Sequence, residues 1–244
     1  MQFQLTFTLS EPLLLPMGYH STLQGFIYSL LGQQPAYSAF LHDRGYHADS
    51  HSFRGFCYSL ITGKYRITGS FITFYHRISF EIRSPLEHFC SILETALMEQ
   101  EHFYLAGQEL FLEKCERTQT VISDDALHIH MLSPMCISQT YLGEDKKKTR
   151  YLIPGTTEFE TQINHNLSSK KQALLESLPI RPITITPIHP SESDKYVTKF
   201  KNKTYITAYN GTYHLTGDPE DLQFLYDCGI GSRNSQGFGL FHIL

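Results

Sequence analysis

The sequence predicts an α+β protein made of two tandem ferredoxin-like domains, each with the order strand, helix, strand, strand, helix, strand. Two observations carry this prediction. Short stretches with strand-like apolar patterns alternate along the chain with stretches whose apolar residues recur at helical spacing. In addition, a chain of 244 residues has room for two domains of ordinary size.

The first domain is expected over residues 1–122. It opens on a strand whose residues Phe3, Leu5, Phe7 and Leu9 alternate with polar residues, so that one face is buried. Its other elements are helices over 20–31 and 35–43, strands over 54–62 and 65–83, a helix after Ser84 and a strand over 103–115. Ser84 is the expected N-cap of that helix, with Pro85 in its first turn.

The second domain is expected over residues 123–244, after a polar stretch that is poor in apolar residues. Its elements are a strand over 128–142, a helix over 156–178, strands over 183–188, 204–209 and 213–217, a helix from 219 and a last strand over 238–244. Asp218 is the expected N-cap of the last helix, Pro219 its first residue and Gly229 its C-terminal stop.

Composition restricts the class of protein. The five cysteines are odd in number and none are closely spaced, which favours free thiols in a reducing cytoplasm over disulfides or a zinc site. No apolar stretch approaches the length of a membrane span, so no membrane partner is expected. A net charge of −4 argues against a general nucleic-acid coat protein but leaves local RNA binding open.

The most distinctive stretch is a glycine-rich segment, residues 229–239, between the last helix and the last strand. Its glycines are Gly229, Gly231, Gly237 and Gly239, and the donors between them include Ser232, Arg233, Asn234 and Ser235. Glycine permits positive φ and close backbone approach, and these donors suit phosphate and sugar oxygens. The pattern is neither a Walker loop nor a dinucleotide fingerprint. The residues alone leave both a flexible turn and an anion-binding loop open.

A second candidate binding surface is a stripe of lysines. Lys199, Lys201 and Lys203 alternate along the chain, so on a strand they share one face. Such a stripe either contacts RNA phosphates or protects a solvated edge strand from pairing, and the sequence leaves both interpretations open.

Five segments together resemble the CRISPR repeat-RNA endoribonucleases, the Cas-six family. The C-terminal pattern Gly-Ile-Gly, five residues, Gly-Phe-Gly resembles the glycine-rich loop of that family. The other four, in chain order, are LQGFIYSLL at 23–31, FLHDRGY at 40–46, FRGFCYSLI at 53–61 and MLSPMCISQ at 131–139. They resemble the family's first helix, its histidine-bearing segment, the following strand and the start of its second domain. The resemblance therefore spans nearly the whole chain.

The resemblance implies an RNA-cleaving activity that needs no metal and no cofactor. Members bind CRISPR repeat RNA and cut it by attack of a 2′-hydroxyl on the adjacent phosphate. The products are guide RNAs with a 2′,3′-cyclic phosphate and a fragment with a 5′-hydroxyl. Further partners implied are subunits of a CRISPR effector complex and a second copy of the chain.

Three residues match the family's catalytic positions. His42 lies where members place a general acid or base, and an imidazole exchanges protons near neutral pH. Tyr28 matches a tyrosine that orients the attacking hydroxyl or contacts the phosphate. Arg54 stands where some relatives have lysine, which implies an electrostatic role. The residues alone also allow Tyr28 to be a core tyrosine and His42 to be a helix-end histidine, with His20 as the rival base.

Two other functions remain open. A non-catalytic RNA-binding subunit of a CRISPR effector complex would share the fold and the glycine-rich loop, but would not need His42 near Tyr28 and Arg54. An unrelated ferredoxin-like regulator would explain the repeated order of elements but not the loop.

Overall fold

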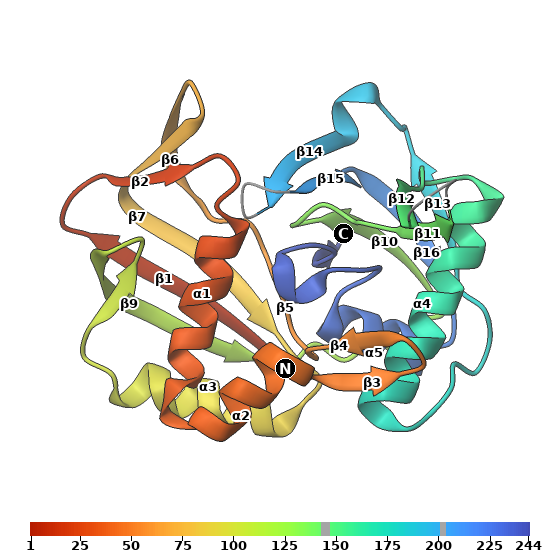
Figure 1. The fold of residues 1–244 in the computed structure, drawn as a ribbon, viewed down its shortest axis with the longest axis horizontal. Coiled ribbons are helices and arrows are strands. Elements are labelled where there is room, and N and C mark those ends of the chain that lie inside the picture. The colour runs from red at the N-terminus through yellow and green to blue at the C-terminus, as the bar shows by residue number, and fades with distance from the viewer. Residues whose placement is uncertain (143–146, 201–203) are drawn as a thin grey trace.

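The computed structural model describes residues 1–142, 147–200 and 204–244, and forms two α+β halves that lie side by side (Figure 1). Of the residues predicted to bind RNA, Lys201 and Lys203 lie outside the described residues. Within the described part of the chain, no helix is long and apolar enough to cross a membrane.

The first half is built on an antiparallel sheet with the order β2-β7-β1-β9-β8, in which β5 and β6 also pair with β7. Its strands are β1 (Gln2–Leu9), β2 (Leu13–Pro16), β5 (Cys57–Tyr58), β6 (Thr62–Thr68), β7 (Phe71–Arg83), β8 (Phe103–Leu105) and β9 (Gln108–Thr118). Its helices are α1 (His20–Leu30), α2 (Pro35–Ala39) and α3 (Glu87–Glu99). The apolar side chains of β1 face α1, where the rings of Phe7 and Phe26 meet edge to face at 5.7 Å.

The second half is a four-stranded sheet with the order β13-β16-β10-β17. Its strands are β10 (Ala126–Met131), β13 (Thr184–Ile188), β16 (Thr212–Thr216) and β17 (Phe241–Ile243), and its helices are α4 (Thr157–Leu175) and α5 (Pro219–Cys228). Two hairpins stand outside this sheet, β11 (Ser138–Leu142) with β12 (Lys147–Tyr151), and β14 (Lys195–Phe200) with β15 (Thr204–Tyr209).

Both sheets have the strand order of a ferredoxin-like domain, because the first and third strands of each unit pair at the centre. The predicted fold class is therefore confirmed. Each half also has its own apolar core, one drawing on residues from Phe3 to Leu110 and the other on residues from Ile122 to Phe241. The division of the chain at residue 122 stays a prediction.

Helix ends follow the local sequence in two cases. The side chain of Thr156 accepts a hydrogen bond from the N–H of Phe159 at 3.3 Å and begins α4. Asp218 accepts from the N–H of Glu220 at 3.0 Å, with Pro219 in the first turn of α5 and Gly229 at its end. The predicted boundaries of α5 are thus confirmed.

The predicted start of α3 is wrong. The helix begins at Glu87, so Pro85 lies before its first turn. Ser84 is buried, and its hydroxyl donates to the carbonyl oxygen of Gly55 at 2.5 Å and accepts from the N–H of Leu86 at 3.0 Å. The Ser84 hydroxyl, which the local sequence predicts as a helix cap, therefore bonds to Gly55, 29 residues away in the chain.

Four predicted strands also differ. Only 57–58 and 62 of the stretch 54–62 are in strands, and the stretch 128–142 divides between β10 and β11. The stretch 103–115 forms the hairpin of β8 and β9, with positive φ at Ala106 and Gly107 in its turn, and the last strand begins at 241 rather than 238. In 54–62, 128–142 and 238–244, most of the apolar residues outside the strands are buried in irregular chain, which gives the same hydrophobic signal as a strand.

Two features hold the halves together. The guanidinium of Arg83, at the end of β7, donates to the carbonyl oxygens of Tyr226 and Phe241 at 3.2 and 2.9 Å and pairs with Glu81. The hairpin of β3 (Tyr46–Ala48) and β4 (His51–Phe53) reaches from the first half towards α4 (Figure 1). The junction between the halves is therefore a fixed place where residues of both can form one site.

Candidate active site

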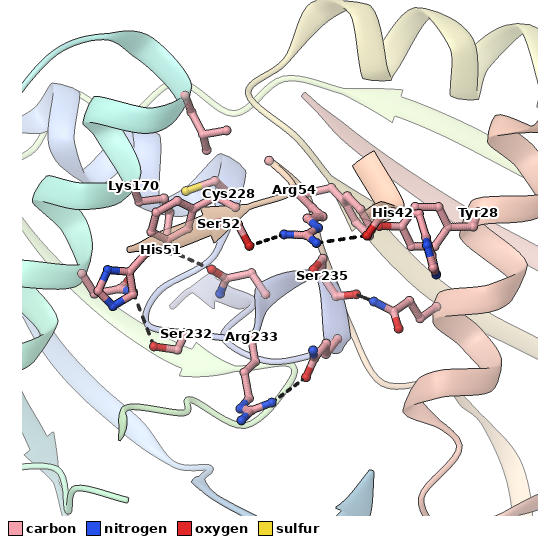
Figure 2. Close-up of a pocket in the computed structure, with 18 of the residues that line it drawn as sticks. Tyr28, His42, His51, Ser52, Arg54, Lys170, Cys228, Ser232, Arg233 and Ser235 are labelled. Atoms are coloured by element: carbon pink, nitrogen blue, oxygen red, sulfur yellow. Dashed lines mark hydrogen bonds between the residues drawn. The ribbon is translucent and has the colours of Figure 1, made fainter. Parts of the chain in front are cut away.

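A cleft of about 450 Å³ lies between the two halves. The first half contributes α1, the turn after α2 and the segment around β4, and the second half contributes α4 and the glycine-rich segment 229–239. Figure 2 shows Tyr28 and His42 on one side of the cleft, His51, Lys170 and Ser232 on the other, and Arg54 between them.

The three residues predicted to be catalytic come together in this cleft. The rings of Tyr28 and His42 meet edge to face with centroids 5.5 Å apart. The guanidinium of Arg54 donates to the carbonyl oxygen of His42 at 3.0 Å and to the hydroxyl of Ser52 at 2.6 Å. A fixed positive charge therefore stands beside the imidazole and the phenol, although Arg54 is 26 residues from Tyr28 in the chain.

His42 is carried on a π-helical turn (Phe40–Arg44) that continues α2 and ends at Gly45. Gly45 has φ 70°, and a Cβ there would lie 2.4 Å from the carbonyl oxygen of Phe53. Only glycine lets these two backbone segments approach so closely. The approach brings Arg54 against the turn that carries His42.

Asp43 is a member of the site that the sequence analysis missed. Its carboxylate lies 2.7 Å from Nδ1 of His42. Because a carboxylate accepts, Nδ1 carries the proton, and Nε2 of a neutral His42 is left as an acceptor. The side chain of His42 is 64% exposed, so this nitrogen can meet a ligand. The sequence signal that could have identified Asp43 is its position next to the candidate base His42.

Tyr28 is half-buried between α1 and the turn of His42. Burial raises the pKa of its phenol, and the charge of Arg54 opposes that rise. The phenol is therefore held in its neutral form at neutral pH, in which its hydroxyl can donate a hydrogen bond.

The glycine-rich segment is an ordered loop. Its four predicted glycines all have positive φ, between 77° and 84°. At Gly239 an added Cβ would lie 2.0 Å from the carbonyl oxygen of Ile230, so the two ends of the loop touch backbone to backbone. Gln24 of α1 donates to the carbonyl oxygen of Ser235 at 2.7 Å and ties the loop to the first half.

Lys170 of α4, which the sequence analysis also missed, holds the loop by hydrogen bonds from its buried ammonium. It is 1% exposed, and its ammonium donates to the carbonyl oxygens of Gly229 and Gly231 at 2.8 Å each and to Oδ1 of Asn234 at 2.7 Å. Burial lowers the pKa of this lysine. These three partners of Lys170 are neutral oxygens, so a buried ammonium stands beside the cleft without a carboxylate among its hydrogen-bond partners in the described part of the chain.

The predicted donors of the loop divide into two groups. Asn234 is buried and its amide is used inside the loop, because Nδ2 donates to the carbonyl oxygens of Ile230 and Phe238. Its side chain thus holds the loop, which differs from the expected phosphate contact. Ser232, Arg233 and Ser235 line the cleft beside Asn234, and the Arg233 guanidinium donates to the side-chain oxygen of Gln236 at 2.9 Å.

Lys199 lies apart from the cleft residues, on β14. Its ammonium is 5.8 Å from the ring centre of Tyr205 on the neighbouring strand, and its side chain is exposed. The structure therefore describes one of the three lysines of the predicted stripe, and the stripe stays a prediction.

His20, the rival base, is buried away from the cleft at 1% exposure. Nδ1 lies 3.1 Å from the carbonyl oxygen of Gln236, so it donates, and Nε2 lies 3.0 Å from the hydroxyl of Tyr196, from which it accepts. Burial lowers the pKa of His20 to about 4. Both ring nitrogens are occupied in a neutral imidazole that joins α1, β14 and the loop.

This burial predicts a dependence of stability on pH. The unfolded imidazole binds a proton near pH 6.5 and the folded one only near 4, so the unfolded state binds more protons between these values. Stability from His20 is therefore present above pH 6.5 and lost as the pH falls towards 4. We expect the free energy of unfolding of wild type to exceed that of His20→Gln at pH 7, and this difference to shrink by roughly 2–3 kcal/mol at pH 4.5. Urea unfolding at both pH values measures it, and a constant difference would contradict it.

Among the described residues, no group of three or more histidine, cysteine, aspartate or glutamate side chains is arranged to hold a metal ion. The polar groups that line the cleft include the imidazoles of His42 and His51, the phenol of Tyr28, the guanidinium of Arg54 and the donors of the loop. They suit an anionic ligand, since positive charge and hydrogen-bond donors line the cleft from both halves.

The sequence is similar to that of known CRISPR-associated proteins. The family model described as CRISPR associated protein Cas6, C-terminal, matches residues 115–243, more than half of the chain. The CRISPR-associated endoribonuclease Cas6 1 of Methanocaldococcus jannaschii is 24% identical over 239 residues, which cover 93% of this chain and 86% of that protein.

Solved structures show the same fold at low identity. A CRISPR associated protein Cas6 has a TM-score of 0.80 at 22% identity, covering 100% of this chain and 99% of its own. A Cas6-related protein from Pyrococcus furiosus has a TM-score of 0.82 at 18% identity, with coverage of 100% and 98%. A RAMP protein described as binding different RNA substrates has a TM-score of 0.81 at 17% identity, with coverage of 100% and 99%. Because the family model matches more than half of the chain, the chain belongs to the Cas6 family of CRISPR-associated proteins.

Proposed function

We propose that this protein is an endoribonuclease that binds CRISPR repeat RNA and cuts it within the repeats to release guide RNAs. The observation that carries the proposal is that Tyr28, His42 and Arg54 line the same cleft as the glycine-rich loop. The relative from Methanocaldococcus jannaschii bears the name of an endoribonuclease, and a structural neighbour is described as an RNA binder, which supports the same conclusion.

The proposed reaction uses a nucleophile of the RNA itself. The 2′-hydroxyl before the cut attacks the phosphorus, so a P–O2′ bond forms while the P–O5′ bond breaks. The hydroxyl proton passes to Nε2 of His42, and the imidazolium of His42 then gives a proton to the leaving O5′, so that His42 ends the reaction in its neutral form. The products are a 2′,3′-cyclic phosphate and a 5′-hydroxyl, and neither water nor a metal ion enters the balance.

The neighbouring side chains assist each step. The carboxylate of Asp43 stabilises the imidazolium that His42 becomes. The guanidinium of Arg54 stabilises the charge that develops on the phosphate oxygens, and the phenol of Tyr28 donates to the phosphate or orients the attacking hydroxyl. Arg54 is a poor proton donor, because a guanidinium keeps its charge, so proton transfer falls to His42.

The glycine-rich loop is the proposed phosphate site. Ser232, Arg233 and Ser235 supply donors, and the charge of Lys170 beneath the loop favours an anion above it. Lys199, Lys201 and Lys203 extend RNA contacts beyond the cleft in this proposal. Association with effector subunits or with a second copy of the chain, and a cytoplasmic location, stay predictions.

The test is incubation of the purified protein with its cognate repeat RNA in excess EDTA, with analysis of the fragment ends. We expect a single cut that leaves a cyclic phosphate and a 5′-hydroxyl. Tight binding without a cut would instead identify a non-catalytic RNA-binding subunit. Absence of binding would contradict the proposed function altogether.

Arg54 offers a separate prediction. We expect Arg54→Ala to slow cleavage by roughly 10²-fold, because one charged donor to the phosphate is lost, and Arg54→Lys to be about tenfold less damaging. Single-turnover cleavage rates measure both. Arg44→Ala is the matched control, since Arg44 is an exposed arginine on the turn that carries His42 and does not line the cleft. Equal rates for Arg54→Ala and Arg44→Ala would remove Arg54 from the site.

A further inference from the structure

The end of the cleft opposite Tyr28 and His42 has a different chemistry. There α4 and the loop bring Asn166 beside Ser232, and β4 brings His51 (Figure 2). None of these three side chains carries a fixed charge, and Phe53 and Leu174 add apolar wall. The ammonium of Lys170 also lies on this side, but it is bound to the oxygens of Gly229, Gly231 and Asn234. This end therefore offers a ligand uncharged polar groups and an apolar wall, which suit a flat ligand with a polar edge.

Asn166 is the distinctive residue of this end. It is 8% exposed, Nδ2 makes a single long hydrogen bond of 3.4 Å to Oγ of Ser232, and Oδ1 has no partner among the described residues. Reversing the amide would exchange the two atoms but still leave one of its ends unpaired. Buried amide groups are nearly always hydrogen-bonded, so an unpaired one that lines a cleft points to a ligand that completes it.

The same helix shows what a structural asparagine looks like. Asn164 accepts from the N–H of Ile183 at 2.8 Å and donates to the carbonyl oxygens of Ile183 and Glu160 at 2.9 Å each. Its amide is fully used in joining α4 to the chain before β13. Asn166, two residues later, has no comparable set of partners among the described residues.

We infer that this end of the cleft is a nucleobase pocket in which Asn166 hydrogen-bonds the edge of one unpaired base of the RNA. The inference rests on the proposed function and adds to it a residue that determines base identity. An amide offers an acceptor and a donor side by side, which matches the edge of a base and not a phosphate.

The side chains around the pocket include aromatic rings on which a nucleobase could stack. His51 is exposed, and its ring lies 6.4 Å from that of Phe53 and 5.9 Å from that of His165. An imidazole at the rim of a cleft is a surface on which a base can stack. Because His51 and Phe53 come from the first half and Asn166 from the second, the pocket exists only where the halves meet.

The base that is read lies close to the cut. The candidate catalytic residues and Asn166 line one continuous cleft, whose volume of about 450 Å³ is within the range for a single small ligand. The base therefore belongs to a nucleotide within one or two positions of the scissile phosphate.

The test compares repeat RNAs in which each nucleotide within three of the cut is replaced in turn by the other three. For wild type we expect cleavage efficiency to differ by about tenfold or more between bases at one of these positions. In Asn166→Leu, we expect the difference to fall within about threefold, with the thermal midpoint unchanged or raised, because no amide is left unpaired. The isosteric Asn166→Asp can only accept, so its preference moves to guanine, whose edge carries two adjacent donors.

Asn164→Leu is the matched control. We expect it to lower the thermal midpoint, because it leaves buried backbone groups of residue 183 unpaired, while the base preference of the folded protein is kept. The two asparagines therefore give opposite patterns if one is structural and the other reads a base.

Three outcomes overturn the inference, and they can be told apart. Wild type that cleaves its repeat equally well with every base has no such pocket. If the base preference is unchanged in both Asn166→Leu and Asn166→Asp, Asn166 does not contact the base, and its amide has a structural role or binds water. A wild-type protein that does not cleave its repeat RNA at all removes the proposed function, and the pocket with it.

Discussion

Replacing His42 with alanine is expected to slow cleavage of repeat RNA by about 10²–10⁴-fold, the usual contribution of a positioned acid or base. RNA affinity should stay close to that of wild type, because the donors of the loop and the charges of Arg54 and Lys170 remain. Single-turnover rates and equilibrium binding to the uncut RNA separate the two effects.

The control for this variant is His47→Ala. His47 is an exposed histidine on β3, five residues along the chain, and does not line the cleft. We also expect Asp43→Asn to slow cleavage, by less than His42→Ala, because the imidazolium loses its carboxylate partner while the base itself stays. A rate for His42→Ala equal to that of His47→Ala would assign proton transfer to another group.

Replacing Lys170 with methionine is expected to weaken RNA binding by at least about tenfold and to lower the free energy of unfolding by about 2–4 kcal/mol. The ammonium bonds three oxygens of the loop, at Gly229, Gly231 and Asn234, and all three would lose their partner. The loop would lose its shape and the positive charge beneath it. Binding of the repeat RNA below the thermal midpoint, together with urea unfolding, measures both effects.

Lys171→Met is the matched control for that experiment. Lys171 is the adjacent residue and equally buried, but its ammonium pairs with Asp221 and Glu220 of α5 at 2.6 and 2.9 Å. Its loss should also destabilise the fold, since a buried carboxylate is left unpaired, but RNA affinity of the folded protein should be kept. Equal RNA affinities for the two variants would show that Lys170 acts only through stability.

The local pattern of the sequence determined the elements whose signals lie within a few residues of each other. Alternation in β1 set its buried face, and the Asp218-Pro219 start and Gly229 stop set the limits of α5. The spacing of the glycines at 229–239 was enough to expect a loop with positive φ, because that conformation depends on each residue itself.

The helical spacing of apolar residues in α4 also indicates which way Asn166 and Lys170, the two missed polar residues, face. Asn166 and Lys170 fall on the same face of α4 as the apolar residues Phe159, Ile163, Leu167 and Leu174. The sequence thus placed them on the buried side. It could not show what they meet there, because the oxygens that Lys170 binds belong to a loop about 60 residues further along the chain.

Only the tertiary structure distinguishes the surroundings of the two candidate histidines. His20 and His42 stand in similar local surroundings in the sequence, on or beside short helices of the first half. Packing of β14 and the loop against α1 buries His20 to 1% exposure and occupies both its nitrogens, whereas the turn of His42 stays open to the cleft. The sequence by itself determined the order of the main elements, the loop and the residues that could react. Which of these side chains face a ligand depended on contacts between distant segments, because burial and hydrogen-bond partners across the junction of the two halves are not local properties of the chain.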